Sequence, residues 1–108
     1  HKEDMLAIAN ITNAGLAALA AGNLPAVGIA MDACHKRLQN IQVSSPALDL
    51  LVNSARPHSF GAKLTGAGGG GCMVALTNNP KRVAEAIEIA GGKPLISRFG
   101  TEGVRLID

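Results

Sequence analysis

The first half of the chain shows the periodicity of three amphipathic helices. The first starts near Asp4 and ends at Gly22, a residue type that commonly terminates helices. Asn23 is placed to cap the second helix, whose apolar positions recur at alternating steps of four and three residues. Ser45 and Pro46 are placed to cap and open the third helix. The predicted apolar faces are Met5, Ile8, Leu16 and Leu19; Val27, Met31, Cys34, Leu38 and Ile41; and Leu48, Leu51, Val52 and Ala55.

The second half of the chain changes from a helical to a strand pattern. Residues 60–65 alternate between the two faces of a strand, and residues 72–76 form a continuous apolar run typical of a buried strand. A fourth helix, capped by an asparagine, is predicted over residues 80–90. Two short strands at residues 95–98 and 104–107 follow, joined by a turn rich in glycine.

This order of elements predicts an α+β fold. Three helices precede two strands, a further helix and two more strands, and both strand pairs have connections short enough for antiparallel hairpins. We therefore expect an antiparallel sheet of about four strands, ferredoxin-like in arrangement, packed against helices, with a helical N-terminal half. With 108 residues, the chain has room for one compact domain.

Composition and charge argue against several classes of function. Hydrophobic residues make up 47% of the chain but aromatic residues only 2%, and the net charge of +2 comes from scattered basic residues. Nucleic-acid-binding proteins concentrate positive charge and use aromatic rings as stacking platforms, so no nucleic-acid partner is expected. The apolar stretches fall short of the roughly 20 residues that a membrane span needs, so no membrane partner is expected either.

The cysteines and the chain start add two expectations. Cys34 and Cys72 lie far apart without a CxxC pattern or a paired histidine, which argues against a disulfide framework and a metal site. A reducing, cytoplasmic location is the simpler interpretation. The opening residues 1–5 lack the features of a signal peptide, and we expect them to lie inside a longer protein.

The least usual feature is a cluster of five glycines in six positions. It matches the dinucleotide pattern G-x-G-x-x-G, but that loop must run from a strand into a helix, whereas this one runs into a predicted strand. A Walker A loop is also excluded, because Cys72 and Met73 stand where that motif needs Lys and Ser or Thr. The cluster consists of Gly66, Ala67, Gly68, Gly69, Gly70 and Gly71.

Two interpretations of this cluster remain open on chemistry alone. It is either an ordinary hairpin loop or a segment whose backbone approaches a ligand closely. Ordering many glycines costs more backbone entropy than a simple turn requires, which favours the second interpretation. Successive backbone N–H groups suit an anion such as phosphate.

The cluster lies within a longer motif that resembles a known family. Residues 63–72, with the sequence KLTGAGGGGC, resemble the third signature motif of the GHMP kinases, the family of the galactose, homoserine, mevalonate and phosphomevalonate kinases. The motif is most similar to the mevalonate kinase branch. Residues 38–49 and 100–104 also resemble segments of that branch, so the resemblance extends from about residue 31 to the C-terminus.

The resemblance implies a role for these residues in a kinase. The whole chain, residues 1–108, would form the C-terminal domain of an enzyme that uses ATP and Mg²⁺ to phosphorylate a small-molecule alcohol. In the mevalonate branch this is the 5-hydroxyl of mevalonate, in isoprenoid biosynthesis. Thr65 and the glycines of residues 66–71 would lie near the substrate or the transferred phosphate, and Lys63, on the same strand face as Thr65, is a further candidate.

The chain lacks other parts that the resemblance requires. No serine- and glycine-rich nucleotide loop of the P-x-x-x-G-L-G-S-S-A type occurs in it. The catalytic base, its partner lysine and most ligands of ATP and Mg²⁺ are therefore expected in an N-terminal domain, and no catalytic or metal-binding residue is assigned here. We expect the chain alone to be inactive, with this N-terminal domain as its partner and a homodimer left open.

Two alternatives to this function stay open. The chain could belong to another GHMP kinase with a different acceptor, such as phosphomevalonate, homoserine or galactose. It could also be a self-sufficient α+β regulatory module whose glycine segment binds an anionic metabolite or a partner.

Five further residues have chemistry to consider. Asp32 is expected on a solvated helix face, and His35, within a basic cluster, on a wet helix face. His58 is expected in a loop. Cys72 has apolar neighbours that favour a small buried residue, and Cys34 lies on the apolar face of its helix and is expected in the core.

Overall fold

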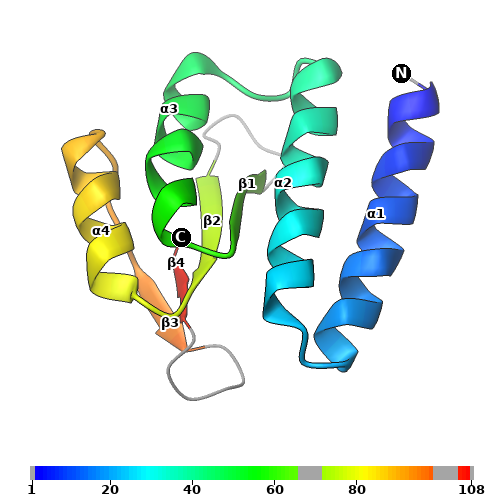
Figure 1. Ribbon diagram of the computed structural model, residues 1–108. Helices are drawn as coiled ribbons and strands as arrows, with labels where there is room; N and C mark the ends of the chain where they lie inside the picture. Colours follow the sequence, from blue (N-terminus) through cyan, green and yellow to red (C-terminus); the bar gives the residue numbers. More distant parts are fainter. Residues whose placement is uncertain (1, 66–71, 99–104, 108) are drawn as a thin grey trace.

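A computed structural model describes residues 2–65, 72–98 and 105–107 of the chain, without the side chains of residues 97, 98 and 105–107. Figure 1 shows the arrangement of the helices and strands along the chain. The elements are α1 (Lys2–Ala20), α2 (Leu24–Asn40), α3 (Pro46–Ala55), the 3-10 turn η1 (Arg56–His58), β1 (Gly61–Thr65), β2 (Cys72–Thr77), α4 (Pro80–Ile89), β3 (Ile96–Arg98) and β4 (Arg105–Ile107).

The strands form one sheet in the order β1-β2-β4-β3, and every neighbouring pair is antiparallel. All five residues of β1 pair with β2, from Gly61 opposite Leu76 to Thr65 opposite Cys72. The predicted α+β class with an antiparallel sheet is confirmed. Among the described strands, β1 and β3 are the edge strands.

The core lies between the hairpin of β1 and β2, called the first hairpin below, and the helices α3 and α4. Buried side chains of α3, α4, β1 and β2 form one cluster, against which Leu48 and Leu51 of α3 also pack. The predicted apolar face of α3 is therefore confirmed. The cluster consists of Val52, Ala55, Ala62, Met73, Ala75, Val83 and Ile87.

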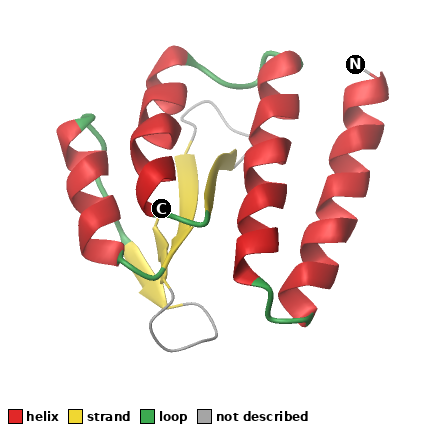
Figure 2. Ribbon diagram, in the orientation of Figure 1, coloured by secondary structure: helices red, strands yellow, loops and turns green. Residues whose placement is uncertain are grey.

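The N-terminal helices are placed differently from α3 and α4. Figure 2 shows α1 standing beside α2, on the side away from the sheet, and α1 makes its main contacts with α2. No residue of α1 is buried. Met5 and Leu16, on the predicted apolar face, are 56% and 60% exposed, so that face is not covered by the described residues.

Local capping signals explain the starts of α2 and α3. The Asn23 side chain accepts a hydrogen bond from the Ala26 N–H, and the Ser45 hydroxyl oxygen accepts one from the Leu48 N–H, as predicted. The prediction for the fourth helix was wrong in one respect, because the Asn79 side chain makes no capping bond. The backbone N–H of Asn79 instead donates to the Thr77 hydroxyl.

Candidate functional site

Two candidate residues from the sequence, Lys63 and Thr65, lie on one face of β1. They are two positions apart in a strand, so their side chains project to the same side of the sheet. Both are half-buried, whereas Ala62 and Leu64 on the opposite face are buried. Lys63 and Thr65 therefore face away from the core that α3 and α4 cover.

The other candidates lie outside the described residues. They form the segment between Thr65 and Cys72. These two residues face each other as the last register pair of β1 and β2. The segment therefore connects two antiparallel strands, which differs from the strand-to-helix connection of a dinucleotide loop. These candidates are Gly66, Ala67, Gly68, Gly69, Gly70 and Gly71.

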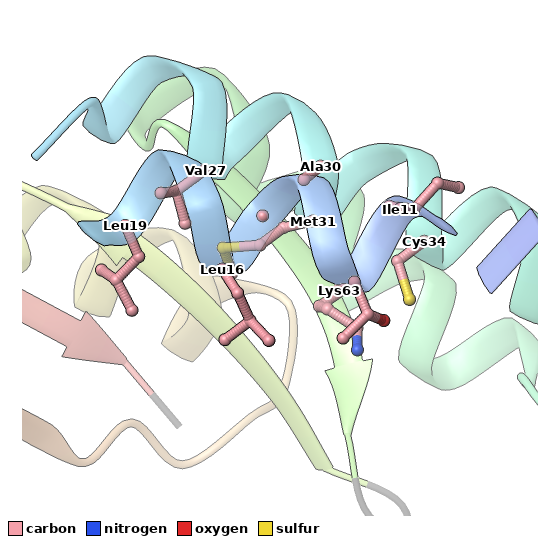
Figure 3. Close-up of a pocket in the computed structure, with 10 residues that line it drawn as sticks. Ile11, Leu16, Leu19, Val27, Ala30, Met31, Cys34 and Lys63 are labelled. Carbon is pink, nitrogen blue, oxygen red and sulfur yellow. The ribbon is translucent and has the colours of Figure 1, made fainter. Parts of the chain in front are cut away.

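An apolar groove of about 210 Å³ lies between α1 and α2, and Lys63 extends into it from β1. Figure 3 shows Lys63 near Cys34, with Leu19 and Val27 toward the other end of the groove. Lys63 is the only charged residue among the ten that line it. Among the described residues, no ion pair involves Lys63, which leaves its amine available for an anion.

A second hollow lies at the other end of the first hairpin. It is lined by residues 57–60, Asn78 and Asn79. The expectation that His58 lies in a loop needs a small correction, because it ends the 3-10 turn η1. Its carbonyl accepts a hydrogen bond of 2.8 Å from the Thr77 hydroxyl, so the backbone of His58 is fixed at the end of the sheet that is remote from Thr65.

The outer edge of β1 is covered by α2 rather than by a strand. β1 pairs only with β2 among the described strands, so alternate N–H groups on its free edge need other acceptors. Asp32 Oδ1 accepts from the Ala62 N–H at 2.9 Å, and His35 Nδ1 accepts from the Leu64 N–H at 3.0 Å. Two side chains of one helix thus complete the hydrogen bonding of this edge.

Arg56 completes the contact around Ala62. Its Nε donates to Asp32 Oδ1 at 2.9 Å, and its Nη2 donates to the Ala62 carbonyl at 3.3 Å. The prediction that Asp32 lies on a solvated face was therefore wrong. The edge of β1 supplies a backbone donor that a solvent-exposed aspartate would not have. Arg56 balances the negative charge of Asp32.

The prediction for His35 was also wrong, because this residue is only 1% exposed. Lys36 and Arg37 beside it are exposed, but a helix turns by about 100° per residue, so neighbours in sequence face different directions. Since Nδ1 accepts the Leu64 N–H, the ring proton sits on Nε2, which donates to Asp49 Oδ1 at 3.0 Å. The Ser44 hydroxyl donates to the same oxygen at 2.7 Å.

The surroundings of His35 and Asp49 shift both pKa values downward. Burial lowers the pKa of His35 below its ordinary 6.5, and the positive charges of Arg56 and Lys63 act in the same direction, while Asp49 opposes them. The hydrogen bond from Ser44 is the main reason that the pKa of Asp49 lies below its ordinary 3.8. His35 is therefore a neutral acceptor at neutral pH.

These shifts predict two losses of stability on acidification. In the first window, between the unfolded pKa of His35 near 6.5 and its lowered folded value, the unfolded chain binds the extra proton, so the free energy of unfolding falls as pH falls. The second loss starts near pH 3.8, where the Asp49 carboxyl takes up a proton in the unfolded chain but not yet in the folded one, and ends once the folded carboxyl is protonated too. Urea unfolding across this pH range measures both, and the variant H35N should lack the first loss. The assignment would be contradicted if the free energy of unfolding fell equally with pH in wild type and H35N between pH 6.5 and the start of the second loss.

A second helical stripe, missed by the sequence analysis, explains how α2 sits on β1. Gly28, Asp32 and His35 are spaced four and three residues apart and share one face of α2. A methyl group at Gly28 would overlap the Phe60 carbonyl and lie 2.8 Å from the Gly61 nitrogen. In the sequence this contact shows only as a periodic row of glycine, aspartate and histidine beside the apolar face, a spacing that a solvated helix face can also have.

The two cysteines differ in exposure. Cys34 is buried, as predicted, and lies beside the groove between α1 and α2. Cys72 is exposed, so the prediction of a small buried residue was wrong. It is the first residue of β2, at the end of the sheet rather than over the core.

Neither a cluster of metal ligands nor a membrane-spanning helix occurs among the described residues. No three side chains of His, Cys, Asp or Glu among them lie close enough together to hold a metal ion. In the same ranges, no helix has the length and apolar character needed to cross a bilayer.

Comparison with known proteins gives consistent matches. The family model of the GHMP kinases C terminal matches residues 16–94. The mevalonate kinase of Pyrococcus furiosus is 48% identical over 82 residues, which cover 74% of this chain and 25% of that enzyme. The mevalonate kinase of Pyrococcus abyssi is 50% identical over 82 residues, which cover 74% of this chain and 24% of that enzyme. The chain thus spans about a quarter of the length of these relatives.

A galactokinase matches over a shorter stretch. The enzyme from Roseiflexus sp. is 45% identical over 65 residues, which cover 57% of this chain and 17% of the galactokinase. The similarity therefore extends to relatives whose names indicate different acceptors.

Proposed function

Because the chain belongs to the family of GHMP kinases C-terminal domains, we propose that it is the C-terminal domain of an ATP-dependent kinase that phosphorylates the 5-hydroxyl of mevalonate. The choice of mevalonate as the acceptor rests on the similarity to two mevalonate kinases. Their sequences are about 50% identical to this chain over about three quarters of its length. The ferredoxin-like arrangement of the sheet and a cytoplasmic location are parts of the same proposal.

Lys63, Thr65 and the glycines of residues 66–71 are the proposed substrate-facing residues. Lys63 and Thr65 share the sheet face opposite the core, so an ammonium group and a hydroxyl are available on one side of β1. Phosphoryl transfer depends mainly on positioning and on stabilising negative charge. A lysine cation and a threonine hydroxyl can both hold a phosphate oxygen, and glycine N–H groups can add to this site.

The fit to the cofactors is partial. When bound, ATP would supply the phosphoryl group, and Mg²⁺ would neutralise part of its charge. Lys63 and Thr65 suit phosphate oxygens, but the described residues contain no cluster of metal ligands. We therefore propose that the Mg²⁺ ligands, the nucleotide loop and the catalytic base belong to an N-terminal domain, the partner of this one. This agrees with the quarter of the relatives' length that the chain covers.

The alternative acceptor is a sugar, favoured by the galactokinase match. The deciding experiment uses the longer enzyme in which we propose this domain to lie. It measures ADP release and product formation with mevalonate, phosphomevalonate, homoserine and galactose. We expect kcat/KM to be highest for mevalonate by about 100-fold or more, since a site built to bond substrate polar groups rejects molecules that lack them.

Each other result has a definite meaning. Preference for galactose would replace the acceptor but keep the kinase. Absence of phosphorylation with every alcohol would contradict the kinase and favour a regulatory module. The 108-residue chain alone serves as the negative control, because it should not turn over ATP.

A further inference from the structure

We infer that His35 is a positioning residue for the substrate-facing strand: by accepting the Leu64 N–H it holds the end of β1 that carries Lys63 and Thr65. The inference rests on the proposed function, because that proposal makes these two residues substrate-facing. It adds a buried residue of α2 that faces neither the groove nor the proposed substrate.

The hydrogen bond from Leu64 fixes a particular peptide group. The Leu64 N–H belongs to the peptide that joins Lys63 to Leu64, and the next residue is Thr65. A 3.0 Å bond to a ring that is 1% exposed therefore restrains the backbone between the two candidate residues. A bend of the strand at this peptide would move Thr65 relative to Lys63, because the peptide lies between these two residues.

Three residues of α2 contact successive positions along β1 and the residue before it, and His35 makes the contact nearest the end of the strand. Gly28 packs on the Phe60 backbone, Asp32 accepts the Ala62 N–H, and His35 accepts the Leu64 N–H. The first two contacts hold the start of the strand, which Arg56 also holds through the Ala62 carbonyl. Among the described side chains, His35 is the one that bonds to the outer edge of β1 nearest Thr65. Loss of its acceptor should therefore loosen the substrate-facing end while the start stays fixed.

The orientation of His35 is itself fixed from a second side. Asp49 of α3 accepts the Nε2–H, and the Ser44 hydroxyl donates to the same Asp49 oxygen. This arrangement keeps the proton on Nε2 and leaves Nδ1 free to accept. The role of His35 thus depends on which ring nitrogen lacks a proton.

Protonation would remove the acceptor. The charged groups around His35 are Asp49 from α3, Arg56 from η1, Lys63 from β1 and Asp32 on α2 itself. A proton on Nδ1 would face the Leu64 N–H, and two donors cannot bond to each other. The positioning of β1 should consequently be lost at acid pH, while burial keeps the ring neutral at neutral pH.

Two variants of the longer kinase separate the two ring nitrogens. H35N can place an oxygen near the position of Nδ1 and keep the bond from Leu64, whereas H35Q reaches toward Asp49 and loses that acceptor. At neutral pH we expect H35Q to lower kcat/KM for the alcohol by about tenfold, the effect of one lost buried hydrogen bond. H35N should stay close to wild type and should lose the acid decline in kcat that the ring causes. The exposed neighbour variant K36Q is the matched control.

Hydrogen exchange provides a readout independent of activity. The Leu64 amide should exchange faster in H35Q than in wild type and K36Q, and should stay protected in H35N. If H35Q fails to fold, the comparison of wild type with H35N across pH carries the test through both the exchange rate and kcat.

Two results would overturn the inference. One is a purely structural effect, in which both variants lower the melting temperature alike but leave kcat, KM and the pH profile unchanged. The other is unchanged protection of Leu64 in H35Q. Failure of the proposed function is distinguishable, because then wild type phosphorylates no alcohol while the exchange experiment still reports on the bond from Leu64.

Discussion

Replacing Gly28 with alanine should lower the free energy of unfolding by about 2 kcal/mol or more. The added methyl group would overlap the Phe60 carbonyl, and the opposing Gly61 has no side chain that could move aside. An alanine in a helix interior gains about 1 kcal/mol over glycine, but the backbone contact must open to admit it. Because α2 would shift away from β1, the bonds of Asp32 and His35 to the strand would lengthen as well.

Gly15 on α1 offers a matched control for this substitution. It also lies inside a helix, but a methyl group there would be 3.3 Å from the Ala30 Cβ, a contact that a small shift between two helices relieves. Gly15→Ala should therefore change stability by less than about 1 kcal/mol. Urea unfolding of both variants measures the difference. A Gly28→Ala variant as stable as wild type would contradict the close seating of α2 on β1.

Valine in the glycine segment should affect turnover rather than folding. In the longer kinase we expect Gly68→Val or Gly69→Val to lower kcat about 100-fold, the cost of displacing reacting groups by about 1 Å. A β-branched residue restricts the backbone and adds bulk where we propose that the chain approaches the substrate and phosphates. We expect the melting temperature to stay near that of wild type, because the buried core that the structure describes is built from side chains of α3, α4, β1 and β2.

Steady-state kinetics and thermal unfolding of the same samples test this prediction. Gly69→Ala is the graded control and should lose less activity, because alanine is smaller and is not β-branched. Unchanged kcat and KM in the valine variants would remove the segment from the mechanism. A loss of melting temperature in parallel with activity would point to a folding role instead.

Sequence patterns predicted the parts of the fold that depend on near neighbours. Asn23 and Ser45 cap their helices through residues three positions away, so these helix starts could be inferred from local spacing. The inward positions of α3 followed from helical periodicity, because this helix packs on the sheet through a single face. The pairing of β1 with β2 followed from two strand patterns separated by a short segment.

The errors at Asp32 and His35 concern polar residues whose partners are distant backbone groups. Asp32 bonds to an N–H 30 residues away and His35 to one 29 residues away, and no pattern of side chains marks a free strand edge. A solvated helix face and a face that binds a strand edge both carry polar residues, so periodicity alone cannot distinguish them. Lys63 and Thr65 could be placed on one strand face from alternation alone.

The seating of α2 on β1 also bears on aggregation. A free sheet edge can recruit a strand of another molecule, and natural proteins protect such edges with covers, charges or short strands. On β1, the outward N–H groups of Ala62 and Leu64 are already bonded to Asp32 and His35. At the opposite border of the described sheet, β3 contains only three residues. Both borders are thus poor templates for intermolecular strand pairing, and the helix that fixes β1 also shields the domain from forming fibrils through that strand.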